Sequence, residues 1–302
     1  MSATPIHVPV LAAEVLQWLE QRPGQVIVDG TLGGGGHTRL ITEQLAKDEG
    51  PRTKDETGFV LALDRDPAAV AAAERNLAGL AVKVANANFC DLPDVLDSLG
   101  IVAVDAVLLD LGLSSDQLAD EGRGFSFESG GPLDLRFNRE EGESAAELIA
   151  RLPERELADL IYQYGEERFS RRIARRIVEL RAERPIRTAA ELAEIVRRCV
   201  PRSKDRIDPA TRTFQALRIA VNRELESLEL ALQRIPERLK PGGRLAIISF
   251  HSLEDRRVKE AFRSDPRLKP LTKKPVRASE EEVFRNPRSR SAKLRVAERV
   301  SP

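Results

Sequence analysis

A glycine-rich segment, 29–37 (DGTLGGGGH), is the first feature of the sequence that could bind a ligand. Five glycines follow a short apolar run and precede a helical pattern, so the backbone there can approach a ligand closely. The spacing is not the G-x-G-x-x-G pattern of dinucleotide-binding proteins. We expect the carboxylate of Asp29 to pair with an aminoacyl ammonium group, which favours a methyl donor over a nicotinamide. The alternative interpretation is a flexible loop that is rich in glycine by chance.

Carboxylates also end two other apolar runs. Asp64 follows residues 59–63, and a carboxylate at that place can accept hydrogen bonds from both ribose hydroxyls of an adenosine. An acid that stabilises a helix N-terminus is the alternative, and it suits Asp66, just before Pro67, better than Asp64. Asp110 follows residues 106–109, at the edge where doubly wound folds bind their ligands.

Three further residues are candidates with structural alternatives. Phe89, in segment 88–91, can pack against an adenine ring or belong to the core. In segment 110–117, which contains Gln117, a helix cap at Ser114 or Ser115 is the simpler interpretation. His251 follows an apolar run and is, with Asp110, a candidate to accept a proton in catalysis, although single histidines are more often structural.

Strand and helix patterns alternate before and after a helical stretch. The apolar runs predict strands at 26–29, 59–63, 82–85, 106–109 and 244–250, with weaker ones near 267–272 and 292–298. Helical patterns occupy 10–19, 37–45, 67–78, 213–239 and 251–263, and the proline and glycines at 241–243 stop the long helix. This alternation predicts a parallel, doubly wound sheet with helices on both faces.

An inserted subdomain interrupts this pattern. Residues 116–211 carry no strand signal, and apolar residues recur at helical spacing over 144–200. We therefore predict a ligand-binding α/β domain formed by 1–117 and 212–302, and an all-helical subdomain at 118–211. The polar stretch 273–291 reads as a long loop.

The amino-acid composition limits the classes of protein to which the chain can belong. The 302 residues are 41% hydrophobic, enough for a core, and 48 basic residues balance 48 acidic ones. Two cysteines and three scattered histidines form no disulfide framework and no zinc cluster, so we expect no metal. No secretory signal and no membrane-length apolar run is visible, and we expect a cytoplasmic protein. The sequence leaves the oligomeric state open.

Basic residues nevertheless concentrate in two places. Residues 263–299 hold 12 Arg or Lys and 5 acids, a local balance of 12 − 5 = +7, and five arginines crowd 168–176. Such patches fit phosphate binding, although a charged stretch is commonly just a solvated face.

With these residues identified, the chain resembles the bacterial small-subunit ribosomal RNA cytosine-N4 methyltransferases. Ten stretches carry the resemblance in order: 7–11, 29–38, 62–67, 108–118, 123–127, 131–137, 164–178, 210–226, 241–259 and 286–299. The resemblance implies a Rossmann-like class I methyltransferase fold that uses S-adenosyl-L-methionine. It implies a target cytosine in the decoding region of 16S ribosomal RNA, cytosine 1402, within the small ribosomal subunit. The implied donor site comprises Gly35, Gly36, His37, Asp64, Phe89, Asp110 and Gln117.

The residues also bear on the reaction. A cytosine amine is a poor nucleophile, so it must be held in line with the methyl group beside a proton acceptor. Enzymes that methylate such amines often carry a proline-proline-aromatic loop, and the residues after Asp110 lack it. Methylation at C5 needs a cysteine nucleophile, and neither Cys90 nor Cys199 is placed for that task.

Three rival functions remain for comparison. A nicotinamide-dependent dehydrogenase would be expected to carry the G-x-G-x-x-G pattern, which this glycine-rich segment does not have. A catalytically inactive RNA-binding module would not need intact donor residues. A DNA cytosine-N4 methylase would usually carry the proline-aromatic loop.

Overall fold

The computed structural model describes residues 9–47, 58–127, 130–201 and 208–301. The chain divides into two compact units, one formed by Met1–Gly112 and Glu226–Pro302 and the other by Leu113–Leu225. The predicted boundaries differ from these: the second unit also contains residues 113–117 and 212–225, which the sequence assigns to the α/β domain. Positions 7 and 8 of the first matching stretch lie outside the described residues.

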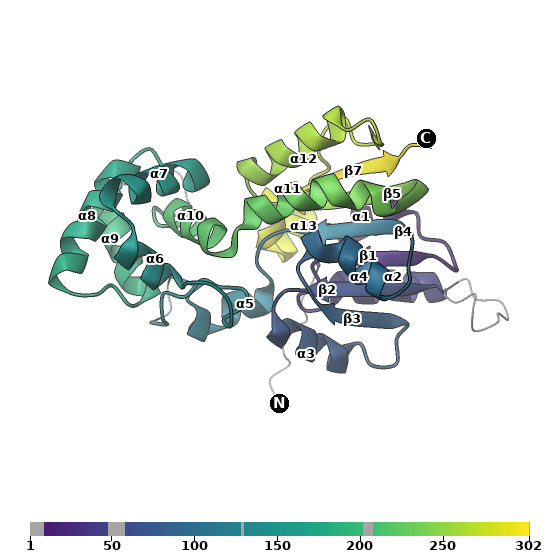
Figure 1. The fold of residues 1–302 in the computed structure, drawn as a ribbon, viewed down its shortest axis with the longest axis horizontal. Coiled ribbons are helices and arrows are strands. Elements are labelled where there is room, and N and C mark those ends of the chain that lie inside the picture. Colours follow the sequence, from purple (N-terminus) through teal and green to yellow (C-terminus); the bar gives the residue numbers. More distant parts are fainter. Residues whose placement is uncertain (1–8, 48–57, 128–129, 202–207, 302) are drawn as a thin grey trace. The chain divides into compact units, whose positions relative to one another are not determined.

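A seven-stranded sheet in the order β3-β2-β1-β4-β5-β7-β6 forms the centre of the first unit (Figure 1). Neighbours from β3 to β5 run parallel, whereas β7 is antiparallel to both β5 and β6. The strands are β1 (Val26–Asp29), β2 (Phe59–Asp64), β3 (Val82–Asn86), β4 (Val104–Asp110), β5 (Leu239–Ser249), β6 (Leu268–Pro270) and β7 (Lys293–Arg299). This confirms the expected Rossmann-like sheet of class I methyltransferases, including the two weaker strands.

Helices cover both faces of this sheet. Successive residues of a strand point to opposite faces, so Ile27 packs in a cluster with α1 and α2, whereas Val28 packs in a cluster with α4, α11 and α12. The helices are α1 (Ala12–Leu19), α2 (Gly36–Ala46), α3 (Pro67–Asn76), α4 (Leu92–Ser98), α11 (Glu224–Arg234) and α12 (Ser252–Ser264). Burial on both faces explains why the strands read as continuous apolar runs.

The strand register collects the polar strand ends at one edge. Asp29 and Asp64 end β1 and β2, and Asp110 ends β4. Ser249, at the end of β5, pairs with Lys293, at the start of antiparallel β7. The chain that enters β7 therefore lies at the same edge as the carboxyl ends of the parallel strands, which we call the catalytic edge.

The second unit is helical over its described residues, with one isolated bridge between Pro132 and Thr188. Its helices are α5 (Ser115–Ala119), α6 (Ala145–Arg151), α7 (Glu154–Gly165), α8 (Ser170–Glu183), α9 (Ala189–Cys199) and α10 (Thr211–Asn222). Helices α5, α6 and α9 begin with capping boxes at Ser114, Ser144 and Thr188. One cluster of buried apolar residues forms the core of this unit. Ser114 thus has the capping role that was the simpler interpretation.

Two sequence-based expectations were wrong. The single helix expected at 213–239 is broken at Arg223, whose φ of 51° is left-handed, and β5 already begins at Leu239. The proline and glycines at 241–243 therefore lie within β5. The expected loop at 273–291 contains α13 (Glu280–Arg285), capped by Ser279, and a 3-10 turn at Pro287–Ser291. No helix among the described residues is long and apolar enough to cross a membrane.

Candidate active site

Asp29 is buried, and its carboxyl group forms hydrogen bonds with the glycine loop and with α2. Its Oδ1 accepts a hydrogen bond from the Thr31 amide at 3.1 Å, and its Oδ2 accepts one from the Thr38 hydroxyl at 2.7 Å. The side chain is fully buried, and burial raises its pKa although the nearby His37 opposes the shift. Asp29 therefore has a structural role inside the protein, and its contact with a ligand ammonium group stays a prediction.

The glycine loop needs glycine at specific positions. Gly35 has φ of 80°, a left-handed conformation, and a Cβ there would come within 3.3 Å of the Leu77 side chain. Gly36 is the first residue of α2, so the loop leads directly into a helix N-terminus. The Gly33 amide donates to Asp64 Oδ2 at 2.8 Å, which ties the loop to the end of β2. The loop is thus a fixed turn, which argues against the flexible-loop alternative.

Each carboxylate oxygen of Asp64 accepts one hydrogen bond within the protein. Oδ2 accepts from the Gly33 amide, and Oδ1 accepts from the Asp66 amide at 2.9 Å. Burial raises the pKa of Asp64 to about 6, against the lowering effect of these two amides. Each carboxylate oxygen retains acceptor capacity for a hydroxyl group. Asp66 caps α3 through the Ala68 amide, which confirms that the helix-terminal role belongs to Asp66.

His37 and Asp110 form an ion pair at this edge. His37 Nε2 lies 3.5 Å from Asp110 Oδ2, and the Asp110 amide donates to the Thr31 hydroxyl at 2.6 Å. Burial by itself lowers the pKa of His37, but Asp110, Asp29 and Glu282 outweigh it and raise that pKa. Asp110 Oδ1 is buried and has no hydrogen-bond partner among the residues that the structure describes. An acceptor atom left this way is suited to a donor group brought by a ligand.

Phe89 is only partly buried. It packs against the apolar cluster on one face of the sheet, and a Cβ at Gly30 would lie 3.1 Å from the Phe89 Cβ. Asn88, the residue before it, caps the short 3-10 turn of 89–91 and donates to the Ser227 hydroxyl at 3.0 Å. Core packing therefore accounts for part of the burial of Phe89, and contact with a planar ligand stays a prediction.

The remaining two candidates have clear structural partners. Gln117 belongs to the second unit, where its Oε1 accepts the Ser114 amide at 3.1 Å. His251 caps α12: Nδ1 accepts the Glu254 amide at 3.4 Å, and Nε2 lies 3.1 Å from Glu254 Oε1. Nδ1 of His251 is thus used in the cap, whereas Nε2 lies close to the Glu254 carboxylate without forming a hydrogen bond among the described residues. The structure brings Gly35, His37, Asp64 and Asp110 together around the first loop, and it gives His251 a capping role.

The gathered residues fit an adenosine-containing methyl donor. The loop at Gly35 favours glycine through its left-handed φ and its close approach to Leu77. Asp64 offers carboxylate oxygens, and Asp110 Oδ1 lacks a partner among the described residues. Within the same described ranges, no group of three or more His, Cys, Asp or Glu is arranged to hold a metal ion.

The basic segments contain both paired and unpaired cations. In the second unit, all five arginines of 168–176 are exposed, and two lie in ion pairs, Arg175 with Glu154 at 3.6 Å and Arg176 with Glu179 at 3.1 Å. In the first unit, Lys293 and Arg295 both bind Asp255. The sequence count of +7 for 263–299 therefore overstates the charge free to meet a phosphate.

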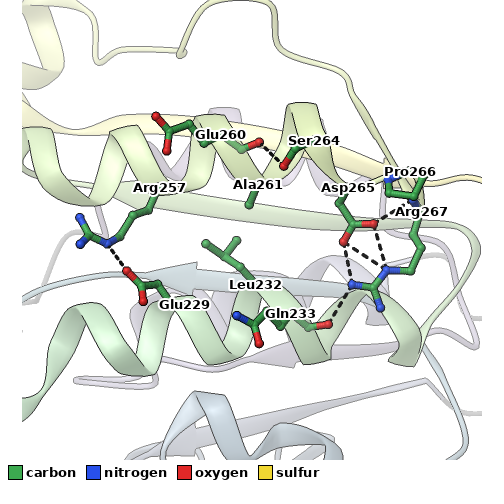
Figure 2. Close-up of a pocket in the computed structure, with 10 residues that line it drawn as sticks. All are labelled: Glu229, Leu232, Gln233, Arg257, Glu260, Ala261, Ser264, Asp265, Pro266 and Arg267. Atoms are coloured by element: carbon green, nitrogen blue, oxygen red, sulfur yellow. Dashed lines mark hydrogen bonds and ion pairs between the residues drawn. The ribbon is translucent and has the colours of Figure 1, made fainter.

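The groove drawn in Figure 2 lies elsewhere on the first unit. It runs between α11 and α12, has a volume of about 560 Å³ and ends near Asp265, at the end of α12 remote from the catalytic edge. Arg257 binds Glu229 at 2.6 Å, and Arg267 binds Asp265 at 2.7 Å (Figure 2). Both arginines of the groove are thus paired with carboxylates, and the groove lies apart from the site at the glycine loop.

Known proteins resemble the chain over almost its full length. The model of the MraW methylase family matches residues 4–300. Ribosomal RNA small subunit methyltransferase H of Rhodopirellula baltica is 53% identical over 300 residues, covering 97% of this chain and 91% of that protein. The protein of the same name from Deinococcus deserti is 52% identical over 296 residues, covering 98% and 94%. A solved rRNA methylase from Streptococcus thermophilus has a TM-score of 0.44 at 12% identity, covering 100% of this chain and 99% of that one.

We predict that affinity for S-adenosylmethionine falls as the pH is lowered through about 6, the pKa of Asp64. The ionised carboxylate is the better acceptor for ribose hydroxyls, and protonation removes it. With a pKa raised to about 6, Asp64 is largely ionised at pH 7 and about one-tenth ionised at pH 5, so affinity should drop roughly tenfold between them. Titration calorimetry at several pH values measures this.

Asp64→Asn is the matched control for that titration. It should bind the donor weakly at pH 7 and show no further loss down to pH 5. Dependence on pH that persists in Asp64→Asn would assign the titration to another group, His37 being the nearest candidate.

We also predict that Gly35→Ala weakens donor binding by more than its effect on stability explains. Alanine at φ of 80° is strained by about 1–2 kcal/mol and also crowds Leu77. Gly79→Ala is the matched control, because Gly79 has φ of 84° but nothing within 4 Å of the added Cβ. Gly79→Ala should lose only the stability that the backbone strain costs, Gly35→Ala should lose somewhat more in urea because it also crowds Leu77, and only Gly35→Ala should lose donor affinity by calorimetry. Equal donor affinity in the two variants would remove the loop from the site.

Proposed function

The chain belongs to the MraW methylase family, and on that premise we propose that it methylates the exocyclic N4 amine of a cytosine in 16S ribosomal RNA. S-adenosyl-L-methionine is the methyl donor. The target that we propose is cytosine 1402 in the decoding region, presented by the small ribosomal subunit. Asp110 carries the proposal, because its buried Oδ1 has no hydrogen-bond partner in the described residues, while its Oδ2 lies 3.5 Å from His37 Nε2.

The first unit supplies the groups that would hold the donor. Asp64 would accept hydrogen bonds from the ribose hydroxyls, the loop at Gly35 and Gly36 would let the ligand approach the backbone, and Phe89 would pack against the adenine. We include Gln117 of the second unit only through the family resemblance, since its side-chain oxygen caps α5. When bound, the donor supplies an electrophilic methyl group on a positively charged sulfur.

Asp110 is the group that we propose as proton acceptor. The cytosine amine is a weak nucleophile because its lone pair is conjugated with the ring, so it must lose a proton as it attacks. Asp110 Oδ1 can accept a hydrogen bond from that amine, which orients its lone pair. His37, 3.5 Å from the other oxygen, stabilises the charged carboxylate and holds it in place. His251 is the less suitable acceptor because its Nδ1 accepts the Glu254 amide and its Nε2 lies close to the Glu254 carboxylate.

Cysteine chemistry supports attack by nitrogen. Methylation at C5 of cytosine requires a thiolate that adds to the ring. Cys90 is buried, and burial raises the pKa of its thiol to about 11. Cys199 is also buried, with its pKa raised by burial. Neither thiol is ionised at neutral pH, so neither is an activated nucleophile.

Exposed arginines support an RNA substrate. Arg168, Arg171 and Arg172 lie on the surface of the second unit and make no ion pair with any described residue. Guanidinium groups free of carboxylates can release counterions when they bind phosphates, which favours a polyanion. We propose that the second unit uses this arginine surface to bind ribosomal RNA.

The test is an incubation with tritiated methyl donor and undermethylated small subunits, free 16S ribosomal RNA and DNA in parallel. Digestion of the labelled product to nucleosides should yield N4-methylcytidine from the subunits. The double variant Cys90→Ala, Cys199→Ala should retain this product, because no covalent step is required. C5-methylcytidine, or label in DNA alone, would overturn the proposal.

Asp110→Asn separates the two roles proposed for this residue. As proton acceptor, Asp110 should contribute roughly 10²–10⁴-fold to kcat at saturating donor. The variant should also lower the pKa of His37, observed by NMR, because it removes the carboxylate charge. Loss of donor affinity with an unchanged kcat would instead restrict Asp110 to donor binding.

A further inference from the structure

Helix α13 lies at the catalytic edge, although the sequence predicts a loop there. Its segment leads through the 3-10 turn of Pro287–Ser291 into β7, whose first residue, Lys293, pairs with Ser249 at the end of β5. Glu282 fixes the helix to the N-terminal segment, because its Oε1 accepts the Leu11 amide at 2.7 Å. The same carboxylate contributes to the electrostatic environment of His37. One side of α13 is therefore anchored next to the candidate active site.

The opposite side of α13 presents Phe284 to solvent. Phe284 is 88% exposed, the largest value among the exposed large hydrophobic residues that the structure describes. Phe284 follows Glu282 by two positions. On a helix with 3.6 residues per turn, the two side chains therefore differ by about 200° in direction around the helix axis. A single exposed apolar residue is common in proteins, so the surroundings decide whether this one has a role.

Unpaired cations surround this segment in the chain. Four exposed residues between 271 and 291 make no ion pair or hydrogen bond with any described residue: Lys273, Lys274, Arg277 and Arg290. Arg285 differs, because it pairs with Glu281 of the same helix. An exposed aromatic ring with unpaired cations near it in the chain is a combination suited to single-stranded nucleic acid, since bases stack on the ring and phosphates bind the cations.

We propose that Phe284 is a stacking platform for an unpaired RNA base next to the target cytosine, and that Lys273, Lys274, Arg277 and Arg290 bind the flanking phosphates. The position beside the target rests on the proposed function. A base that undergoes chemistry must leave its stack, and its neighbours then lose a stacking partner. Phe284, anchored at the catalytic edge through Glu282, replaces that partner.

The first experiment measures RNA affinity without the donor. Fluorescence anisotropy follows binding of a labelled single-stranded oligoribonucleotide with the decoding-region sequence, and of the same strand in a perfect duplex. Phe284→Ala should bind the single strand about 5- to 150-fold more weakly, the range for the removal of one base stack. Phe284→Trp should restore the affinity, and binding of the duplex should not change.

Val102→Ala is the matched control. Val102 is 80% exposed, also belongs to the first unit and precedes β4, so it lies at the opposite edge of the sheet. It should bind both RNAs like the wild type. Phe284→Ala should also keep the donor affinity of the wild type, because the ring points into solvent.

Salt dependence separates stacking from phosphate binding. Phe284→Ala should lower the affinity without changing the slope of log affinity against log salt concentration. The double variant Lys273→Ala, Lys274→Ala should flatten that slope by about 0.7 for each phosphate that the protein no longer neutralises.

The outcomes distinguish this inference from the proposed function. A Phe284→Ala protein that binds the single strand like Val102→Ala overturns the platform, even if the wild type forms N4-methylcytidine. Weaker binding in Phe284→Ala, restored by tryptophan, supports the platform even if the wild type forms another product. If only binding to whole subunits weakens while naked RNA binds normally, Phe284 contacts a ribosomal protein and the inference is wrong.

Discussion

The buried carboxylate of Asp29 is the interaction on which the catalytic edge depends. A polar group buried away from solvent must be hydrogen-bonded, and the Thr31 amide and the Thr38 hydroxyl meet that need for Asp29. Through them it joins the end of β1, the glycine loop and the first turn of α2. The Thr31 hydroxyl then accepts the Asp110 amide, so the end of β4 is held by the same network. The position of Asp110 at the edge of the sheet thus depends on a carboxyl group that is buried inside the protein.

The distribution of charged residues is uneven, although the net charge is zero. It suits one region of the protein to a cationic methyl donor and other regions to the polyanion RNA. The carboxyl groups of Asp64 and Asp110 lie at the strand ends, and only that of Asp110 has His37 beside it, so this edge offers acceptor oxygens suited to a positively charged donor. The unpaired arginines before and within α8, and the unpaired lysines before α13, suit a polyanion. The balance of 48 basic and 48 acidic residues hides this separation, because total charge carries no information about position.

The sequence predicted the parallel strands well because buried strands leave unmistakable apolar runs, as in β1 and β2. It also identified Asp66 as a helix cap, since Pro67 follows it. It missed the break at Arg223 because a left-handed arginine carries no glycine or proline signal. It missed α13 because that helix buries none of its residues deeply and so lacks an apolar stripe. The internal role of Asp29 was hidden as well, since its partners, Thr31 and Thr38, come together only when the loop folds.

Strands β4 and β5 are neighbours in the sheet, yet the whole second unit, Leu113–Leu225, lies between them in the chain. The free-energy cost of closing a flexible loop rises by only about 0.6 kcal/mol with each doubling of its length. The insertion of the second unit therefore lowers the stability of the folded sheet only slightly. The rate is affected more, because pairing between distant segments slows folding. The register that aligns Asp110 with Ile248 must therefore wait for β5 to be synthesised, and the catalytic edge is completed late in the folding of the chain.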